Sequence, residues 1–131
     1  MREEPEYLLD ASAVLALIQN EPGADRVAGM LPTAAISAVN LAEAITILVR
    51  RSGDPDAAIS MLLLLNLKVL AWGESSAHRS GLVGYLADAG LSLGDRACIT
   101  EGMSFAKTRI ATTDRAWRKI KNIAGRVILI R

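Results

Sequence analysis

YLLDASAVLALI, residues 7–18, is a short apolar run that ends on an aspartate and continues into small residues with helical apolar spacing. Tyr7, Leu8 and Leu9 have no polar residue between them, which is typical of a strand buried on both faces of a parallel sheet. Asp10 follows at the carboxyl end of that strand. Because open α/β sheets bind their ligands just outside this edge, Asp10 is the first candidate functional residue.

Apolar strands and helices alternate along the rest of the chain. Further strands are predicted at residues 33–37, 68–72, 109–113 and 127–130. Helices are predicted from Ser12 to about 19, at 24–30, from Ser37 or Asn40 to 49, at 57–65 after an Asp54 cap, from Ser75 or Ser76 to 86, from an Asp95 cap to 106, and at 114–122. Strands that alternate with helices pair in parallel through right-handed crossovers. We therefore expect an α/β fold, a three-layer α/β/α sandwich with a mainly parallel central sheet, built as one domain from residues 1–131.

The composition favours a soluble cytoplasmic protein. The longest apolar stretch, residues 59–70, is interrupted by polar residues and is too short for the roughly 20 apolar residues of a membrane span. The acidic opening, residues 2–6, lacks the basic flank and apolar region of a signal peptide. Cys98 is the single cysteine, which excludes an internal disulfide and a cysteine-based zinc site. Its apolar neighbours indicate a buried core position.

Hydrophobic residues make up 51% of the chain, and the predicted helix at 57–65 is apolar almost all round. Such a helix must be covered on more than one side. Two interpretations stay open: it is buried in the protein's own core, or it forms a surface for a partner or a second copy.

The net charge of +1 conceals a division along the chain. Residues 1–95 hold six Lys or Arg against twelve Asp or Glu, whereas residues 96–131 hold nine against two. A basic C-terminal third favours an anionic partner such as RNA or DNA, and the alternative is a solvated helix face.

Four acids are predicted to lie at one edge of the sheet: Asp10, Glu43, Asp95 and Asp114. Carboxylates placed together repel and raise one another's pKa, so such a cluster usually binds a cation. Oxygen ligands without His or Cys favour Mg²⁺ or Mn²⁺ over zinc. Each acid also has a structural interpretation, because the three aspartates stand at helix starts and Asn40-x-x-Glu43 is similar to a capping box.

Other chemistries have little support in the sequence. His78 is the only histidine and lies within a predicted helix, which excludes paired imidazoles. A Ser-His-Asp triad would have to use His78, and no serine lies in a nucleophile elbow. No GxGxxG or GK[ST] motif occurs, which leaves nucleotide-cofactor binding without a motif.

Four motifs resemble those of PIN-domain ribonucleases of the VapC toxin type, in order and in spacing. They are LLDASAVLALI around Asp10, SAVNLAEAI around Glu43, GLSLGDRACI around Asp95 and ATTDRAW around Asp114. The resemblance implies a Mg²⁺- or Mn²⁺-dependent endoribonuclease that is usually a homodimer and is held inactive by a small VapB-like antitoxin. It also implies that these four acids form the catalytic metal site, supported by Ser12 and by Thr112 of the family's TxD element.

If the chain cleaves RNA, basic residues near the site acids are candidates for phosphate contacts. They are Arg96, Arg115, Arg118, Lys119 and Lys121. An exposed amphipathic helix is the alternative interpretation for residues 115–121. The competing function is a non-catalytic PIN-like interaction module whose acidic pocket binds a cation or a partner's arginine.

Overall fold

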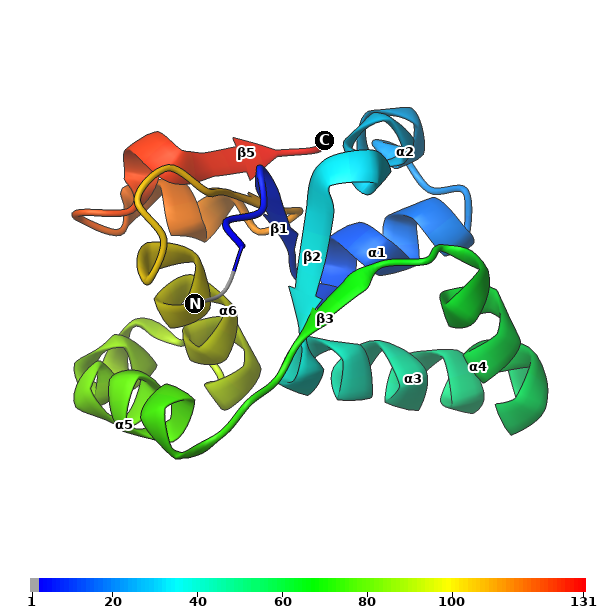
Figure 1. The fold of residues 1–131 in the computed structure, drawn as a ribbon, viewed down its shortest axis with the longest axis horizontal. Helices are drawn as coiled ribbons and strands as arrows, with labels where there is room; N and C mark the ends of the chain where they lie inside the picture. Colours follow the sequence, from blue (N-terminus) through cyan, green and yellow to red (C-terminus); the bar gives the residue numbers. More distant parts are fainter. Residues whose placement is uncertain (1–2) are drawn as a thin grey trace.

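The computed structural model describes residues 3–131, and within them five strands form one parallel sheet in the order β3-β2-β1-β4-β5 (Figure 1). The strands are β1 (Tyr7–Leu9), β2 (Ala34–Ser37), β3 (Lys68–Leu70), β4 (Arg109–Thr112) and β5 (Val127–Leu129). In register, Leu9 of β1 lies between Ile36 and Ala111. The five predicted strands and the parallel α/β fold are therefore confirmed.

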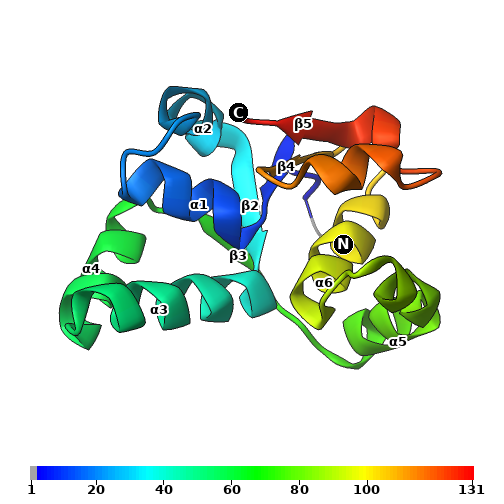
Figure 2. The same ribbon diagram turned by 180° about the vertical axis from the view of Figure 1, so that it is seen from behind.

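Helices cover both faces of this sheet (Figures 1 and 2). They are α1 (Ala11–Ile18), α2 (Ala24–Met30), α3 (Ala38–Ser52), α4 (Pro55–Leu64), α5 (Glu74–Leu82) and α6 (Leu93–Met103). Short 3-10 turns lie at η1 (Leu31–Thr33), η2 (Gly84–Ala89), η3 (Arg115–Lys119) and η4 (Ala124–Arg126). Leu9 packs with α1 to α4 in one core cluster, whereas Leu8 packs with α6 and Trp117 in the other. The alternation of side chains along β1 thus divides the core into two layers.

Several helix starts differ from the sequence prediction. Asp10, not Ser12, caps α1, because its carboxylate accepts the Ala13 N–H. Ser92, not Asp95, caps α6, and Asp95 occupies the third helical position of a reciprocal capping box. Helix α5 starts at Glu74, one residue before the predicted Ser75 or Ser76. The predicted helix at 114–122 is instead the single 3-10 segment η3.

The two isolated reactive side chains lie as the sequence predicts. Cys98 is fully buried, and burial raises the pKa of its thiol well above 9.0. His78 is exposed on α5, where its Nε2 lies 3.7 Å from the Glu74 carboxylate of the same helix. Neither residue lines the hollow that contains Asp10, Glu43 and Asp95.

Helix α4 is not covered by the protein's own core. Only Ala58 and Leu62 are buried, whereas Leu63 and Leu64 are 73% and 84% exposed. The interpretation that buries this whole helix in the chain's own core is therefore wrong for Leu63 and Leu64. No helix among residues 3–131 is long and apolar enough to cross a membrane.

Candidate metal and nuclease site

Asp10 is held in one orientation by three neutral donors. Its Oδ1 accepts hydrogen bonds from the Ser12 hydroxyl at 2.6 Å and from the Ala13 N–H at 2.9 Å. Its Oδ2 accepts one from the Thr112 hydroxyl at 2.6 Å. Only 6% of Asp10 is exposed. The carboxylate therefore joins the end of β1, the first turn of α1 and the end of β4.

The local sequence explains why these groups meet. Leu9 pairs with Ala111 in the parallel ladder, and the Asp10 N–H continues it by donating to the Ala111 carbonyl. Thr112 therefore ends its strand beside Asp10. The Thr112 hydroxyl also accepts the Asp114 N–H at 3.0 Å, and the Ser12 hydroxyl accepts the Thr113 N–H at 3.0 Å. Ser12 and Thr112 thus both orient Asp10 and fix the turn after β4.

Glu43 is positioned by the second turn of α3 and by the start of α6. Asn40, which is 1% exposed, donates to the Glu43 carboxylate at 2.8 Å and to the Gly94 carbonyl at 3.1 Å. The Glu43 carboxylate lies in the space that a Cβ at position 94 would occupy. Glycine at this position therefore allows Glu43 to approach the N-terminal turn of α6.

Asp95 lies one residue after Gly94 and is half-buried. One of its oxygens, Oδ2, accepts the Ser92 N–H at 3.0 Å. Its negative charge raises the pKa of both Asp10 and Glu43, which places it close to both carboxylates. The start of α6 thus carries Asp95 to the site formed by β1 and α3.

Asp10, Glu43 and Asp95 line one hollow of about 300 Å³, which we call the acid hollow. Its other lining residues are Ala11, Ser12, Leu15, Glu21, Asn40, Ile47, Arg51 and Arg131. The fourth predicted acid, Asp114, does not line the acid hollow. It is exposed at the start of η3, where its Oδ1 accepts the Ala116 N–H. The structure therefore brings three of the four acids together. Asp114 is linked to them through Thr112, whose hydroxyl donates to Asp10 and accepts the Asp114 N–H.

Burial dominates the electrostatics of this site. Desolvation raises the pKa of Asp10 from 3.8 to about 6, although hydrogen bonds from Ser12, Thr112 and Ala13 lower it. Burial also raises the pKa of Glu43, against the lowering effect of its Asn40 hydrogen bond. Charged forms of both acids are thus costly in the absence of a bound cation.

The donor set fits a hard divalent cation with retained water ligands. Among residues 3–131, no three His, Cys, Asp or Glu side chains lie close enough together to form a ready-made metal cage. Mg²⁺ does not require such a cage, because it usually keeps several waters and is held through one or two carboxylates. The acid hollow matches that mode of binding by its chemistry, because its three acids need not all contact the ion directly.

The predicted RNA contacts do not line the acid hollow. Arg96, Arg115, Arg118, Lys119 and Lys121 are all absent from its walls, which instead carry Arg51 and Arg131. Arg51 comes two turns after Glu43 on the same face of α3 and forms a hydrogen bond with Gln19. Arg131 faces Glu21 at 3.9 Å. The i, i+4, i+8 spacing of Glu43, Ile47 and Arg51 is the feature of the sequence that could have identified Arg51 as a lining residue. No local pattern identifies Arg131, which reaches the acid hollow through the tertiary fold.

A family model of the PIN domain matches residues 7–123 of the chain. The chain belongs to the PIN domain family. The resemblance in the four acidic motifs is confirmed at the level of the family. The match also covers β1 to β4 and the whole acid hollow apart from Arg131.

Solved structures share the fold of this PIN domain. A chain of DNA-bound VapBC from Salmonella typhimurium superposes with a TM-score of 0.72 at 20% identity, over 98% of this chain and 100% of that one. VapBC2 of Rickettsia felis, bound to a fragment of promoter DNA, has a TM-score of 0.70 at 18% identity, over 94% of this chain and 97% of that one. VapBC-1 of nontypeable Haemophilus influenzae has a TM-score of 0.69 at 22% identity, over 95% of this chain and 97% of that one. The search of curated protein sequences finds no match.

The raised pKa of Asp10 predicts a pH-dependent stability difference. The folded PIN domain holds the Asp10 proton more tightly than the unfolded chain, so its free energy of unfolding falls as the pH rises from about 4 to about 6. Asp10→Asn has no carboxyl proton to release at this position, so its free energy of unfolding does not fall for this reason. Without added metal, the stability of Asp10→Asn relative to the wild type should increase by about 2 kcal/mol between pH 4 and pH 7. Urea unfolding at a series of pH values measures it, and a difference that is constant with pH would contradict the burial of Asp10.

Proposed function

We propose that this PIN domain is a metal-dependent endoribonuclease and the toxin of a toxin–antitoxin pair. The observation that carries the proposal is the buried Asp10 carboxylate, oriented by Ser12 and Thr112 and facing one hollow with Glu43 and Asp95. Neutral donors offset the Asp10 charge only in part, so a bound cation has a favourable place here. Membership of the PIN domain family and the fold shared with VapBC proteins support the same function.

In this proposal Asp10, Glu43 and Asp95 hold Mg²⁺ or Mn²⁺, directly or through water, and Asp114 completes the site from the start of η3. A bound ion of this kind supplies an activated water and neutralises charge on the leaving oxygen of a phosphodiester. Ser12 and Thr112 keep the Asp10 oxygens in place, and Asn40 keeps Glu43 against Gly94. Because water attacks rather than the ribose 2′-hydroxyl, the products carry a 5′-phosphate and a 3′-hydroxyl.

A protein partner is supported by the apolar surface of α4. Exposed Leu63 lines a hollow of about 190 Å³ together with Ile45, Ile59 and Val69, and the next residue, Leu64, is also exposed. Exposed apolar patches of this kind mark protein–protein contacts. We assign this surface to a homodimer contact and expect a separate VapB-like antitoxin to inhibit the acid hollow.

Cleavage of single-stranded RNA by the purified protein tests the metal-carboxylate site. We expect cleavage with Mg²⁺ or Mn²⁺, its loss in EDTA, and a decrease of at least 100-fold in Asp10→Asn and Asp95→Asn, because each removes a charged oxygen ligand. Glu74→Gln, at an exposed acid on α5 outside the acid hollow, is the matched control and should retain full activity. Full activity in EDTA or in both aspartate variants would contradict the proposal. Tight partner binding without cleavage at any enzyme concentration would favour the interaction module instead.

Sedimentation of the isolated protein tests the dimer surface. We expect a dimer that Leu63→Glu combined with Leu64→Glu converts to a monomer, because charges would then be buried in an apolar contact. Leu82→Glu changes an equally exposed leucine on α5 and should leave the dimer intact. A wild-type monomer, or a dimer that survives the double substitution, would contradict the assignment of α4.

A further inference from the structure

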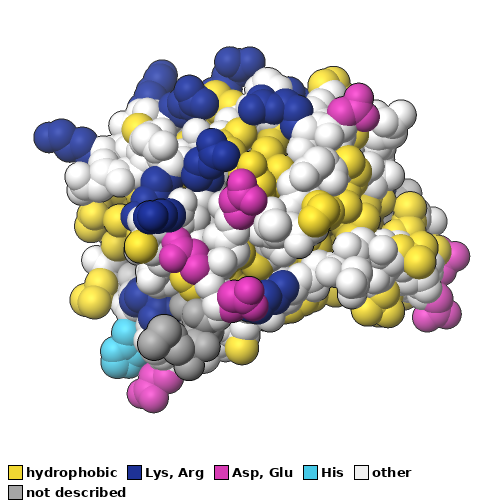
Figure 3. Space-filling model, turned by 45° about the horizontal axis from the view of Figure 1, so that its top comes forward, with side chains coloured by type: hydrophobic (Ala, Val, Ile, Leu, Met, Phe, Trp, Pro, Cys, Tyr) yellow, Lys and Arg dark blue, Asp and Glu magenta, His cyan; other side chains and the backbone are white. Residues whose placement is uncertain are grey.

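A second hollow, of about 540 Å³, carries the opposite charge from the acid hollow. Its charged lining residues are Arg26, Arg109 and Arg118, and no Asp or Glu lines it. Tyr7, Met30 and Ile128 contribute its apolar walls. We call this hollow the basic groove. Figure 3 shows Lys and Arg side chains gathered on the upper part of the face that it displays, with the Asp and Glu side chains mostly below them.

The fold itself positions the three arginines of the basic groove. Arg26 donates to the Leu129 carbonyl and Arg118 donates to the Val127 carbonyl, so both are fixed to β5. Arg109 donates to the Tyr7 hydroxyl at 3.2 Å and lies over the Tyr7 ring at 5.3 Å from its centroid. These contacts use one of the five N–H donors of each guanidinium. The remaining donors and the Tyr7 ring suit the phosphates and bases of a nucleic-acid strand.

The basic groove is connected with the acid hollow through a third hollow. Arg26 lines both the basic groove and a hollow over residues 20–26 and Ile130. Glu21 lines that third hollow and also the acid hollow, where it faces Arg131 at 3.9 Å. Acidic Glu21 and Asp25 lie along this connection, with Arg131 at its end. The three hollows therefore follow one another across the surface between α2 and β5.

The separation of the two sites suits a strand of several nucleotides. Tyr7 starts β1 and Asp10 follows its last residue, Leu9, so the basic groove and the acid hollow lie toward opposite ends of this strand, about 10 Å apart along its backbone. A polyanion that enters the acid hollow and follows the third hollow past α2 can thus contact the basic groove with phosphates several nucleotides away from the one that is cleaved.

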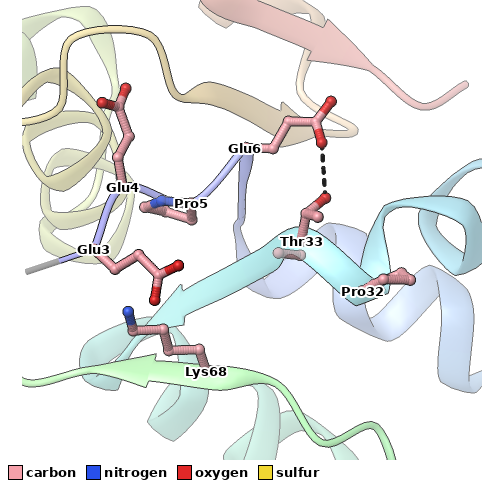
Figure 4. A pocket seen from close by; sticks show the side chains of 8 residues that line it. Glu3, Glu4, Pro5, Glu6, Pro32, Thr33 and Lys68 are labelled. Carbon is pink, nitrogen blue, oxygen red and sulfur yellow. Dashed lines mark hydrogen bonds between the residues drawn. The ribbon is translucent and has the colours of Figure 1, made fainter.

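A different hollow at the amino ends of the strands shows the contrast in charge. Glu3, Glu4 and Glu6 line it, with Lys68 across the space from Glu3 (Figure 4). The Glu6 carboxylate accepts the Thr33 hydroxyl at 2.9 Å, so it is part of the turn before β2. Three carboxylates against one lysine repel a phosphate backbone, whereas the charge of the basic groove attracts it.

We infer that the basic groove binds the backbone of a single-stranded RNA outside the acid hollow, with Arg26, Arg109 and Arg118 on phosphates and Tyr7 against a base. This inference rests on the proposed nuclease function, because the RNA is its substrate. Arg118 then contacts RNA, as the sequence predicts, whereas Arg26 and Arg109 are contacts that the sequence analysis does not find. Phosphate contacts of this kind set affinity and position rather than base specificity.

Fluorescence anisotropy with a labelled 20-nucleotide single-stranded RNA in EDTA tests the basic groove without turnover. Arg109→Gln combined with Arg118→Gln should lower the affinity about tenfold and make binding less dependent on salt, because two phosphate contacts are lost. The single variants Arg109→Gln and Arg118→Gln are compared with Arg50→Gln, which removes the same single charge from an exposed position on α3 outside the described hollows and should bind like the wild type. Thermal unfolding confirms that each variant is folded before binding is measured.

Unchanged affinity in the folded double variant would overturn the inference, as would an equal loss in Arg50→Gln. A loss seen only with double-stranded DNA would also overturn it, since the groove would then serve another ligand. Asp10→Asn separates the two proposals. If the wild type does not cleave RNA but binds it through Arg109 and Arg118, the basic groove is supported and the nuclease is contradicted. If the wild type cleaves RNA and Asp10→Asn does not, while RNA binding is independent of Arg109 and Arg118, the nuclease is supported and the basic groove is contradicted.

Discussion

The hydrogen bonds on the Asp10 carboxylate are the interaction on which the rest of the site depends. They join the end of β1 to the first turn of α1 through Ser12 and Ala13, and to the end of β4 through Thr112. Burial of this carboxylate raises its pKa to about 6 although the same hydrogen bonds lower it, so its charge is offset only in part. The buried position of Asp10 thus connects β1, α1 and β4 at this edge of the sheet and favours a bound cation beside its carboxylate.

Most of the fold could be predicted from the sequence, because buried parallel strands are short apolar runs and each is followed by helical spacing. Helix starts were less predictable. Asp10 and Ser12 can both cap a helix, as can Ser92 and Asp95, and only the pairing of β1 with β4 decides the first choice. The basic segment after Asp114 has helical spacing but forms only the 3-10 segment η3, since Trp117 and Ile123 are buried against the sheet and turn the chain toward β5.

The candidate site was predictable to the extent that its residues lie at strand ends. Asp10 follows β1 and Thr112 ends β4, while Glu43 lies in the second turn of α3 and Asp95 in the first turn of α6. Asn40 and Gly94 were not identified as site residues, because the contact between α3 and α6 that gives them their role is tertiary. Placement of Arg109 over Tyr7 likewise depends on the register of β1 and β4 rather than on any local motif.

The most direct measurement of the central claim is the effect of Mg²⁺ on thermal unfolding at pH 7, compared between the wild type and Asp10→Asn. If the acid hollow binds the ion, Mg²⁺ stabilises the wild type by about 2.7 kcal/mol at 100 times its Kd. Asp10→Asn should show little of this gain, whereas Glu74→Gln on α5 should show all of it. The account is contradicted if Mg²⁺ leaves the wild type unchanged, or if it stabilises Asp10→Asn to the same degree.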